Sequence, residues 1–448
     1  MKKKLTIISD QLYEDTIRTM EDAYYTLENN GNLFIIFRTE YDNDGCVIHD
    51  FLDIINYGLY LGFEYVNTII YPSSMRVIYS IVDNIKYIIW MTKNKNIMLF
   101  NKDLIREKHI WKDVEWGKRE KNYNPKGKDP GNVWIPTNDN GKGKITEHIL
   151  LTDVDIKKKL ILMSLCGNNY EIFTNKTYKQ SNFNTVTSTI NKNTQDKNII
   201  YFLSSENMDK VKDDSVQTII TSPPYWNLKD YFKIGQIGQE SYDQYIKRLY
   251  SVFCESYKKL NNSGSMWINI NIRIYKKQVI LIPYDIISIC KKLGYFYRGI
   301  FIWHKSSGIP VSNTNIVDRH EYILVFSKNK QFSIKKDIQY TFNDYQNELI
   351  NGGAIWNINR KAGSIGKKII HPSIYPNELV RRILLMTTEE GDLVLDPFLG
   401  SGTTLIESIK NKRTCIGFEY NEQFESLINS RLDSELSIDM NKIYKIFQ

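Results

Sequence analysis

The stretch Asp396-Pro397-Phe398-Leu399-Gly400-Ser401-Gly402-Thr403-Thr404 follows the short apolar run Leu393-Val394-Leu395. An apolar run that ends in a carboxylate is typical of a buried parallel strand where it reaches the ligand edge of a sheet. Gly400 and Gly402 can adopt backbone angles closed to other residues and carry no Cβ, so the main chain there can approach a ligand closely. Residues 403–409 then predict a helix. This order indicates an α/β fold that binds a nucleotide-like ligand, although the glycines alone also fit an ordinary strand-to-helix turn.

A carboxylate follows the next predicted strand. The apolar stretch 414–418 ends at Glu419, 17 residues after Gly402 (419 − 402). In nucleotide-binding sheets an acidic residue about 20 residues after the glycine loop reaches the hydroxyl pair of a ribose. We therefore expect Glu419 to bind a ribose; a solvated loop carboxylate is the alternative.

A proline-stiffened loop lies earlier in the chain. Thr221-Ser222-Pro223-Pro224-Tyr225 directly follows the predicted strand 216–220. Two successive prolines fix the backbone angle φ and lack N–H donors, so the loop is rigid and its carbonyl groups point in preset directions.

Such a loop suits the activation of an aromatic amine. The exocyclic amine of cytosine or adenine becomes nucleophilic only when acceptors hold its hydrogens, and the Ser222 hydroxyl and the Pro223 carbonyl are suitable acceptors. Tyr225 offers a ring on which a base flipped out of the duplex can stack. Alignment with a methyl donor then provides most of the catalysis, and no metal is needed. The alternative is a stiff turn with a packed tyrosine.

At these residues the chain resembles the amino-group DNA methyltransferases of the permuted β type, in which the catalytic motif precedes the cofactor motif. The resemblance covers about residues 198–425 and includes the segments 236–240, 302–305, 320–328 and 371–376. It implies a doubly wound, mostly parallel Rossmann-like sheet, with S-adenosyl-L-methionine as the cofactor. The catalytic residues that it implies are Ser222, Pro223, Pro224 and Tyr225; the cofactor-binding residues are Thr221, His371, Pro372, Asp396, Pro397, Phe398, Gly400, Ser401, Gly402, Thr403 and Glu419.

The resemblance also bears on the target base. In this family Ser-Pro-Pro-Tyr usually accompanies methylation of cytosine N4, so Ser222 favours cytosine; adenine N6 is the alternative. We expect site-specific DNA methylation, beside a cognate restriction endonuclease. One departure concerns the cofactor, because Phe202-Leu203-Ser204-Ser205 stands where relatives carry Gly-Asp. A catalytically inactive DNA-binding protein is therefore a distant alternative, and an RNA or protein substrate is a further one.

The first part of the chain contains a second, incomplete copy of the same pattern. The segments around Gly31 and Gly264 align at an offset of 233, and Tyr87 to Lys95 aligns with Tyr322 to Lys330 at 235. Such near-constant offsets indicate an internal repeat. The first copy has neither the proline loop nor the glycine loop. We predict a degenerate methyltransferase-like half over 1–170, a polar linker over 171–197 and a catalytic domain over 198–448.

Two segments are candidates for DNA contact. Residues 116–134 mix basic, aromatic and turn-forming residues, as suits a loop that contacts phosphates and base edges. Residues 328–361 lie where the family places target recognition. We expect the first half to act as a pseudo-subunit that adds DNA contacts; a remnant that only covers apolar surface is the alternative. The predicted DNA-binding residues are Lys118, Arg119, Lys126, Lys128, Lys328, Lys330, Arg360 and Lys361.

Composition agrees with these expectations. The 448 residues suffice for two domains, and the net charge of +8 suits a polyanionic partner. Neither a signal peptide nor a membrane-spanning apolar run is evident, so we expect a prokaryotic cytoplasmic protein. It is expected to be a monomer with an internal pseudo-dimer, or a homodimer. The histidines and cysteines show no metal-ligand spacing, so we assign no metal.

Overall fold

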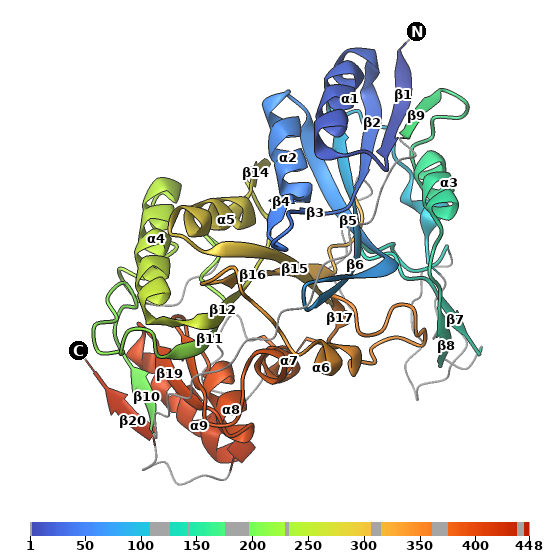
Figure 1. Ribbon diagram of the computed structural model, residues 1–448. Helices are drawn as coiled ribbons and strands as arrows, with labels where there is room; N and C mark the ends of the chain where they lie inside the picture. The colour runs from blue at the N-terminus through green and yellow to red at the C-terminus, as the bar shows by residue number, and fades with distance from the viewer. Residues whose placement is uncertain are drawn as a thin grey trace, which may run out of the picture.

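The computed structural model describes residues 2–107, 126–140, 144–174, 197–228, 233–305, 315–360, 375–436 and 443–447. It contains two α/β units, each built on its own sheet. The unit formed by the first half of the chain stacks on the unit formed by the second half (Figure 1). Within these residues no helix is long and apolar enough to cross a membrane.

The larger sheet has nine strands, and one of them, β16, runs against its neighbours while the other strands pair in parallel. The predicted α/β fold with a mostly parallel sheet is therefore confirmed. In spatial order the strands are β17 (Ile355–Asn357), β15 (Phe296–His304), β16 (His320–Ser327), β12 (Leu260–Ile270), β11 (Val216–Thr221), β18 (Leu393–Asp396), β19 (Thr414–Phe418), β10 (Asn198–Tyr201) and β20 (Ile443–Ile446).

Helices cover both faces of this sheet (Figure 1). The chain leaves β11 toward β12 but leaves β18 in the opposite direction, toward β19. Because parallel crossovers are right-handed, the two connecting helices must lie on opposite faces. One face carries α4 (Tyr242–Lys259) and α5 (Ile282–Lys292); the other carries α7 (Asn377–Thr387), α8 (Thr403–Lys410) and α9 (Glu425–Leu436).

The smaller sheet repeats part of this topology. Its order β5-β6-β2-β1-β9 corresponds to β15-β16-β12-β11-β18, and each pair of neighbours has the same relative direction. Its strands are β5 (Glu64–Ile78), β6 (Ile81–Thr92), β2 (Leu27–Phe37), β1 (Lys3–Ser9) and β9 (Tyr170–Thr174), and its helices are α1 (Tyr13–Thr26), α2 (Phe51–Tyr60) and α3 (Asp153–Met163).

The remaining elements are short. They are the hairpins β3 (Glu40–Tyr41) with β4 (Val47–His49), β7 (Thr137–Asp139) with β8 (Ile145–His148) and β13 (Arg273–Tyr275) with β14 (Gln278–Ile280), the helix α6 (Lys336–Tyr340), and the 3-10 turns Lys102–Ile105 and Glu422–Phe424.

The correspondence between the sheets extends to irregular features. The pairing of β1 with β2 shifts register between Lys3 and Leu5, and that of β11 with β12 shifts between Val216 and Thr218. Lys93 donates from Nζ to the carbonyl of Leu27 at 2.8 Å, and Lys328 donates to the carbonyl of Leu260 at 2.6 Å. Shared strand order would not by itself produce these matching details.

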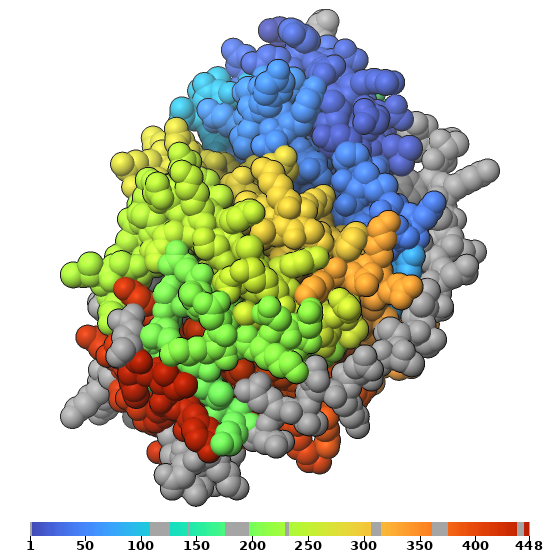
Figure 2. Space-filling model, turned by 60° about the vertical axis from the view of Figure 1, so that its left-hand side comes forward, coloured from blue at the N-terminus to red at the C-terminus, as the bar shows by residue number. Residues whose placement is uncertain are grey.

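The two halves make reciprocal contacts. Asn84, near the start of β6, accepts from the Ala354 N–H at 3.1 Å and donates to the Ile350 carbonyl at 3.2 Å. In return, the segment that leads into β16 contacts the first half, since Val317 exchanges backbone hydrogen bonds with residues 130–132 at 2.9 Å each. In the space-filling view the first half rests directly on the second (Figure 2).

Two predicted boundaries change in this structure. Residues 171–174 belong to β9, which pairs with β1, so they are part of the first sheet and not of the linker; residues 175–196 lie outside the described part of the chain. Much of the predicted recognition segment 328–361 is also structural. Ile350, Ile355 and Trp356 are buried, and β17 is an edge strand of the main sheet.

A buried carboxyl at the junction of the halves gives a pH prediction. Asp50 caps α2 and accepts a hydrogen bond from the Tyr297 hydroxyl at 2.7 Å. Its pKa is raised, mainly by burial and also by the negative charge of Asp53. A raised pKa in the folded state means that stability falls as pH rises through it. The melting temperature should therefore fall less for Asp50→Asn than for the wild type as the pH rises from about 5 to about 8. Asp214→Asn, at an exposed ion pair, is the control; equal slopes in all three proteins would contradict the prediction.

Candidate active site

The proline loop and the glycine loop meet at one edge of the large sheet. Strands β11 and β18 are parallel neighbours, with Thr218 opposite Val394 and Ile219 opposite Leu395. Thr221, the last residue of β11, donates from Oγ1 to Asp396 Oδ1 at 2.8 Å. The helices that follow β11 and β18 lie on opposite faces, so these two strand ends are at the position where open α/β sheets bind their ligands.

Asp396 supports this junction from inside. It is fully buried and accepts four hydrogen bonds, from the hydroxyls of Thr221, Thr404 and Tyr375 and from the Phe398 N–H. Burial raises its pKa, and the hydrogen bonds act in the opposite direction. The predicted cofactor-binding residue Asp396 thus uses its oxygens within the protein, where they hold the strand, the loop and α8 together.

The glycine loop has the predicted backbone. Gly400 and Gly402 have φ of 53° and 80°, in the left-handed region that disfavours residues with a Cβ. Gly402 is also the N-cap of α8, and a Cβ there would come within 3.2 Å of Ile428. Ser401 and Thr403 are buried beside them, so the loop presents mainly backbone.

Arg431 fixes the glycine loop, a role that its place in the sequence does not indicate. This fully buried guanidinium donates to the Ser401 carbonyl at 2.8 Å and to the Ser401 and Thr403 hydroxyls at 2.9 Å each. It also reaches Asn377, at the start of α7, at 3.2 Å. Arg431 lies in α9, outside every recognisable motif, so no sequence signal could have identified it.

Glu419 lies at the tip of β19, next to the glycine loop. Its carboxylate accepts from the Gly400 N–H at 2.8 Å and from the Asn421 N–H at 2.7 Å. Burial raises the pKa of Glu419 to about 7, although these backbone hydrogen bonds act in the opposite direction. A half-buried carboxylate held in this way can accept further hydrogen bonds from a diol.

The polar groups of the proline loop divide into two sets. Most are used within the protein: the Pro224 carbonyl accepts from Tyr245 Oη at 2.8 Å, and the Tyr225 carbonyl accepts from the Leu228 N–H at 3.1 Å. Tyr225 Oη donates to Glu321 at 2.7 Å, and Trp226 Nε1 donates to the Glu240 carbonyl at 2.8 Å.

The other set consists of the half-buried Ser222 hydroxyl and the Pro223 carbonyl. Neither hydrogen-bonds to another residue that the structure describes. The two groups predicted to hold an amine are thus the two acceptors of the loop left free for a ligand.

Ser204 and Ser205, which stand where relatives carry Gly-Asp, are followed directly by the carboxylate of Glu206. These residues follow β10, next to β19, and Ser204 donates to Glu206 Oε2 at 3.0 Å. Glu206 in turn pairs with Arg248 at 2.6 Å. The acidic residue that is usual in this motif is absent, but Glu206 supplies a carboxylate that Arg248 ties to α4.

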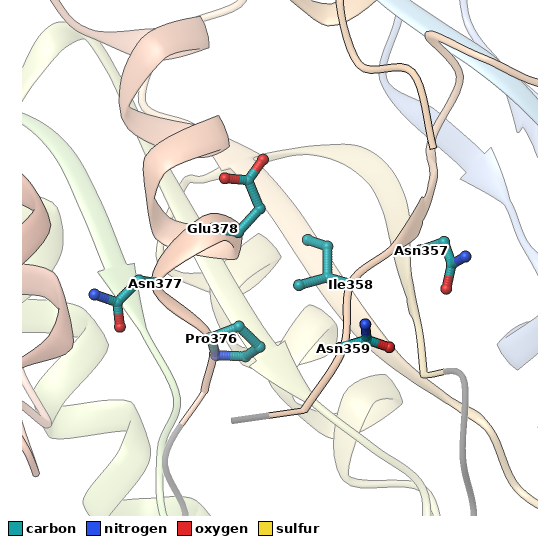
Figure 3. Close-up of a pocket in the computed structure, with 6 residues that line it drawn as sticks. All are labelled: Asn357, Ile358, Asn359, Pro376, Asn377 and Glu378. Atoms are coloured by element: carbon teal, nitrogen blue, oxygen red, sulfur yellow. The ribbon is translucent and has the colours of Figure 1, made fainter. Parts of the chain in front are cut away.

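A pocket of about 370 Å³ opens between the end of β17 and the first turn of α7 (Figure 3). The predicted residues His371 and Pro372 lie outside the described part of the chain, in the segment that ends just before Tyr375. The pocket is lined by Asn357, Ile358, Asn359, Pro376, Asn377 and Glu378.

Two of the predicted DNA-binding lysines lie at the edge of the sheet that carries the proline loop. Lys128 lies 3.7 Å from Glu107, which also pairs with Arg319 just before β16. Burial and the charge of Arg319 lower the pKa of Lys128. Lys126 pairs with Asp103, but its side chain is 66% exposed. Arg360, after β17, is exposed as well.

Two other predicted lysines lie elsewhere. Because β16 runs antiparallel to β12, Lys328 and Lys330 follow it at the edge opposite the proline loop, where they pair with Asp214 and Asp44. This position does not favour DNA contact in a complex centred on the proline loop. Lys118, Arg119 and Lys361 lie outside the described residues.

Comparisons with known proteins identify the family of the chain. A model of the N6/N4 DNA methylase family matches residues 216–430. The type II methyltransferase M.Cfr9I of Citrobacter freundii is 30% identical over 259 residues, which cover 49% of this chain and 82% of that protein. M.SmaI of Serratia marcescens is 30% identical over 248 residues, 48% of this chain and 83% of that one.

Among solved structures, the chain is similar to the PvuII DNA methyltransferase, described as cytosine-N4-specific. That alignment has a TM-score of 0.45 and 22% identity, and it covers 56% of this chain and 92% of the other. Both type II methyltransferases are 30% identical to this chain, and the matches cover 82% and 83% of their length. These matches show that the chain belongs to the N6/N4 DNA methylase family.

Proposed function

We propose that this DNA methyltransferase methylates the N4 amine of a cytosine that is flipped out of double-stranded DNA. The observation that carries the proposal is the hydrogen bond between Thr221 and Asp396, which holds the proline loop beside the glycine loop. S-adenosyl-L-methionine, the cofactor of the family, supplies the methyl group as a reactive sulfonium. The left-handed backbone of Gly400 and Gly402, which carry no Cβ, fits the close approach of such a ligand.

The proline loop would activate the amine by hydrogen bonding. The Ser222 hydroxyl and the Pro223 carbonyl accept the two amine hydrogens, which turns the nitrogen lone pair out of conjugation with the ring. The Tyr225 ring stacks on the extracted base. Transfer of the methyl carbon from sulfur to nitrogen would leave a neutral thioether, and the methylated nitrogen would release its extra proton to water. Pro224 keeps the loop rigid, so little orientation entropy is lost at the transition state.

The cofactor contacts in this proposal come from three segments. The glycine loop approaches the cofactor through its backbone, and Glu419 accepts hydrogen bonds from the ribose hydroxyls. His371 and Pro372 contact the methionine part, as the resemblance implies. The loop residues are Pro397, Phe398, Gly400, Ser401, Gly402 and Thr403, supported by Thr221 and Asp396.

Ser222 decides the proposed base. A hydroxyl at this position is usual for cytosine-N4 enzymes, whereas adenine-N6 enzymes usually carry a carboxylate or amide. Adenine N6 remains the second candidate, because both amines need the same pair of acceptors. Relatives named type II methyltransferases support a role as the modification enzyme of a restriction-modification system with a cognate endonuclease.

We further propose that the first half is a degenerate copy of the catalytic half. The common strand order, the matching register shifts and the reciprocal contacts support this origin. After β1 the chain reads Ser9-Asp10-Gln11-Leu12, with no proline pair. The first half therefore acts as a pseudo-subunit that places Lys126 and Lys128 toward DNA on the side of the proline loop.

The function is tested by expressing the protein in a host that lacks modification and sequencing the DNA by a single-molecule method. We expect N4-methylcytosine within one sequence motif, confirmed by mass spectrometry of nucleosides. Ser222→Ala should lower the rate by about 10- to 100-fold, since one hydrogen bond to the amine is lost. Asp214→Asn, at the opposite edge, should not. N6-methyladenine alone would refute the base assignment, and absence of both modifications would refute the activity.

Cofactor affinity should depend on pH through Glu419. The ribose hydroxyls prefer the ionised carboxylate, whereas the free protein has a Glu419 pKa of about 7. Binding of S-adenosyl-L-methionine should therefore tighten by up to about tenfold as the pH rises from about 6 to about 8. Isothermal titration calorimetry measures this change. The Glu419→Gln variant should bind S-adenosyl-L-methionine more weakly and with little dependence on pH. If its pH profile matched that of the wild type, the ribose role would be refuted.

The DNA role of the first half is tested by removing two charges. Lys126→Gln with Lys128→Gln should reduce the slope of log affinity against log salt by about 2 and weaken binding several-fold. Lys328→Gln with Lys330→Gln, at the opposite edge, is a matched control that should bind DNA normally. If both double variants bind like the wild type, the first half has no contact to DNA through these lysines.

A further inference from the structure

We infer that Glu321 is the positioning residue that orients Tyr225 for stacking on the extracted base. Tyr225 donates from its hydroxyl to Glu321 Oε2 at 2.7 Å. The inference rests on the proposed function, because it concerns how the base is received at the proline loop. It adds a residue that lies in the strand pair next to the loop and outside both motifs.

Glu321 is itself held from two sides. Asn269, near the end of β12, donates from Nδ2 to the same oxygen at 2.8 Å, and Lys305 donates from Nζ to the other oxygen at 3.0 Å. Asn269 also lies 3.4 Å from the Tyr225 hydroxyl. Each carboxylate oxygen thus has a donor, and the group has one orientation in which to accept from the tyrosine.

The supports of Glu321 are part of the rigid sheet. Glu321 pairs with Trp303 in the antiparallel ladder of β15 and β16, and Lys305 donates its backbone N–H to the Arg319 carbonyl at 2.6 Å. Lys305 is 4% exposed, so its ammonium is shielded from competing water. Hydrogen bonds to charged groups in such surroundings are stronger and more directional than neutral ones on the surface.

A fixed hydroxyl orients the whole ring. The phenol of Tyr225 is attached to a loop and not to a strand, so its ring plane is set by its side-chain torsions. Anchoring the hydroxyl at the far end of the ring restricts both torsions, so the plane of the ring is set before a base arrives. Without the anchor, the ring would lose conformational freedom only when the base arrives, at a cost in affinity for the flipped state.

The first half shows that the fold does not require a glutamate at this position. Tyr87 and Tyr322 occupy equivalent places in β6 and β16, and the residue before them is Lys86 in one strand and Glu321 in the other. Lys86 pairs with Asp10 at 3.3 Å and Asp153 at 2.9 Å. Where the proline loop is missing, the glutamate is missing as well, although the tyrosine next to it is present.

A simple structural role for Glu321 makes a different prediction. If the carboxylate only neutralised Lys305, then its loss would lower stability and leave the loop chemistry intact. A role in orienting Tyr225 predicts instead that the effect of changing Glu321 disappears when the tyrosine hydroxyl is already absent. A double-mutant cycle separates the two.

The experiment uses the full chain and a duplex that carries the motif found by sequencing, with 2-aminopurine beside the target cytosine to report base extraction. Glu321→Gln, Tyr225→Phe and the double variant are compared, with Asp214→Asn as the control. We expect each single variant to reduce the 2-aminopurine signal and the single-turnover methylation rate by about tenfold. Affinity for S-adenosyl-L-methionine should stay within about twofold.

The double variant decides between the two roles. It should be no slower than the slower single variant, because both substitutions break the same hydrogen bond. Independent effects that multiply, or a Glu321→Gln protein that extracts the base and methylates like the control, would overturn the inference. Failure of the wild type to methylate would instead overturn the proposed function, so the two failures can be told apart.

Discussion

The hydrogen bond from Thr221 to Asp396 joins the ends of two strands that are 175 residues apart in the chain. It forms because β11 and β18 are neighbours at the point where the sheet changes winding direction, and so their following helices diverge. Asp396 is fully buried, and its carboxylate also accepts hydrogen bonds from Tyr375, Phe398 and Thr404. The spacing between the proline loop and the glycine loop therefore depends on this one carboxylate.

Much of the fold and both loops could be predicted from sequence, because their signals are local. The left-handed angles of Gly400 and Gly402 follow from the absence of a Cβ, and the stiffness of the proline loop follows from its composition. The alternation of apolar runs with helical segments predicted an α/β sheet. The offsets between the two halves predicted which segments would occupy equivalent strands.

The parts that could not be predicted depend on contacts made by distant elements. Arg431 and Glu321 lie outside the two loops, and only the folded sheet brings them to the loops that they support. The position of the lysines after β16 could not be predicted for a related reason. Sequence spacing does not reveal that β16 runs antiparallel, and that direction puts Lys328 and Lys330 at the far edge. Strand direction, and not residue type, decides which charges can face a ligand.

The reciprocal contacts between the halves have a consequence for how the molecule can change. When two identical subunits meet across a two-fold axis, any substitution appears twice and must be compatible with itself. Here Asn84 of the first half contacts Ala354 of the second, and Val317 of the second half contacts residues 130–132 of the first. The residues of these two contacts are encoded separately. Each surface can therefore vary alone, and one side can give up chemistry while the other retains it. A single chain of this design is therefore free to become asymmetric.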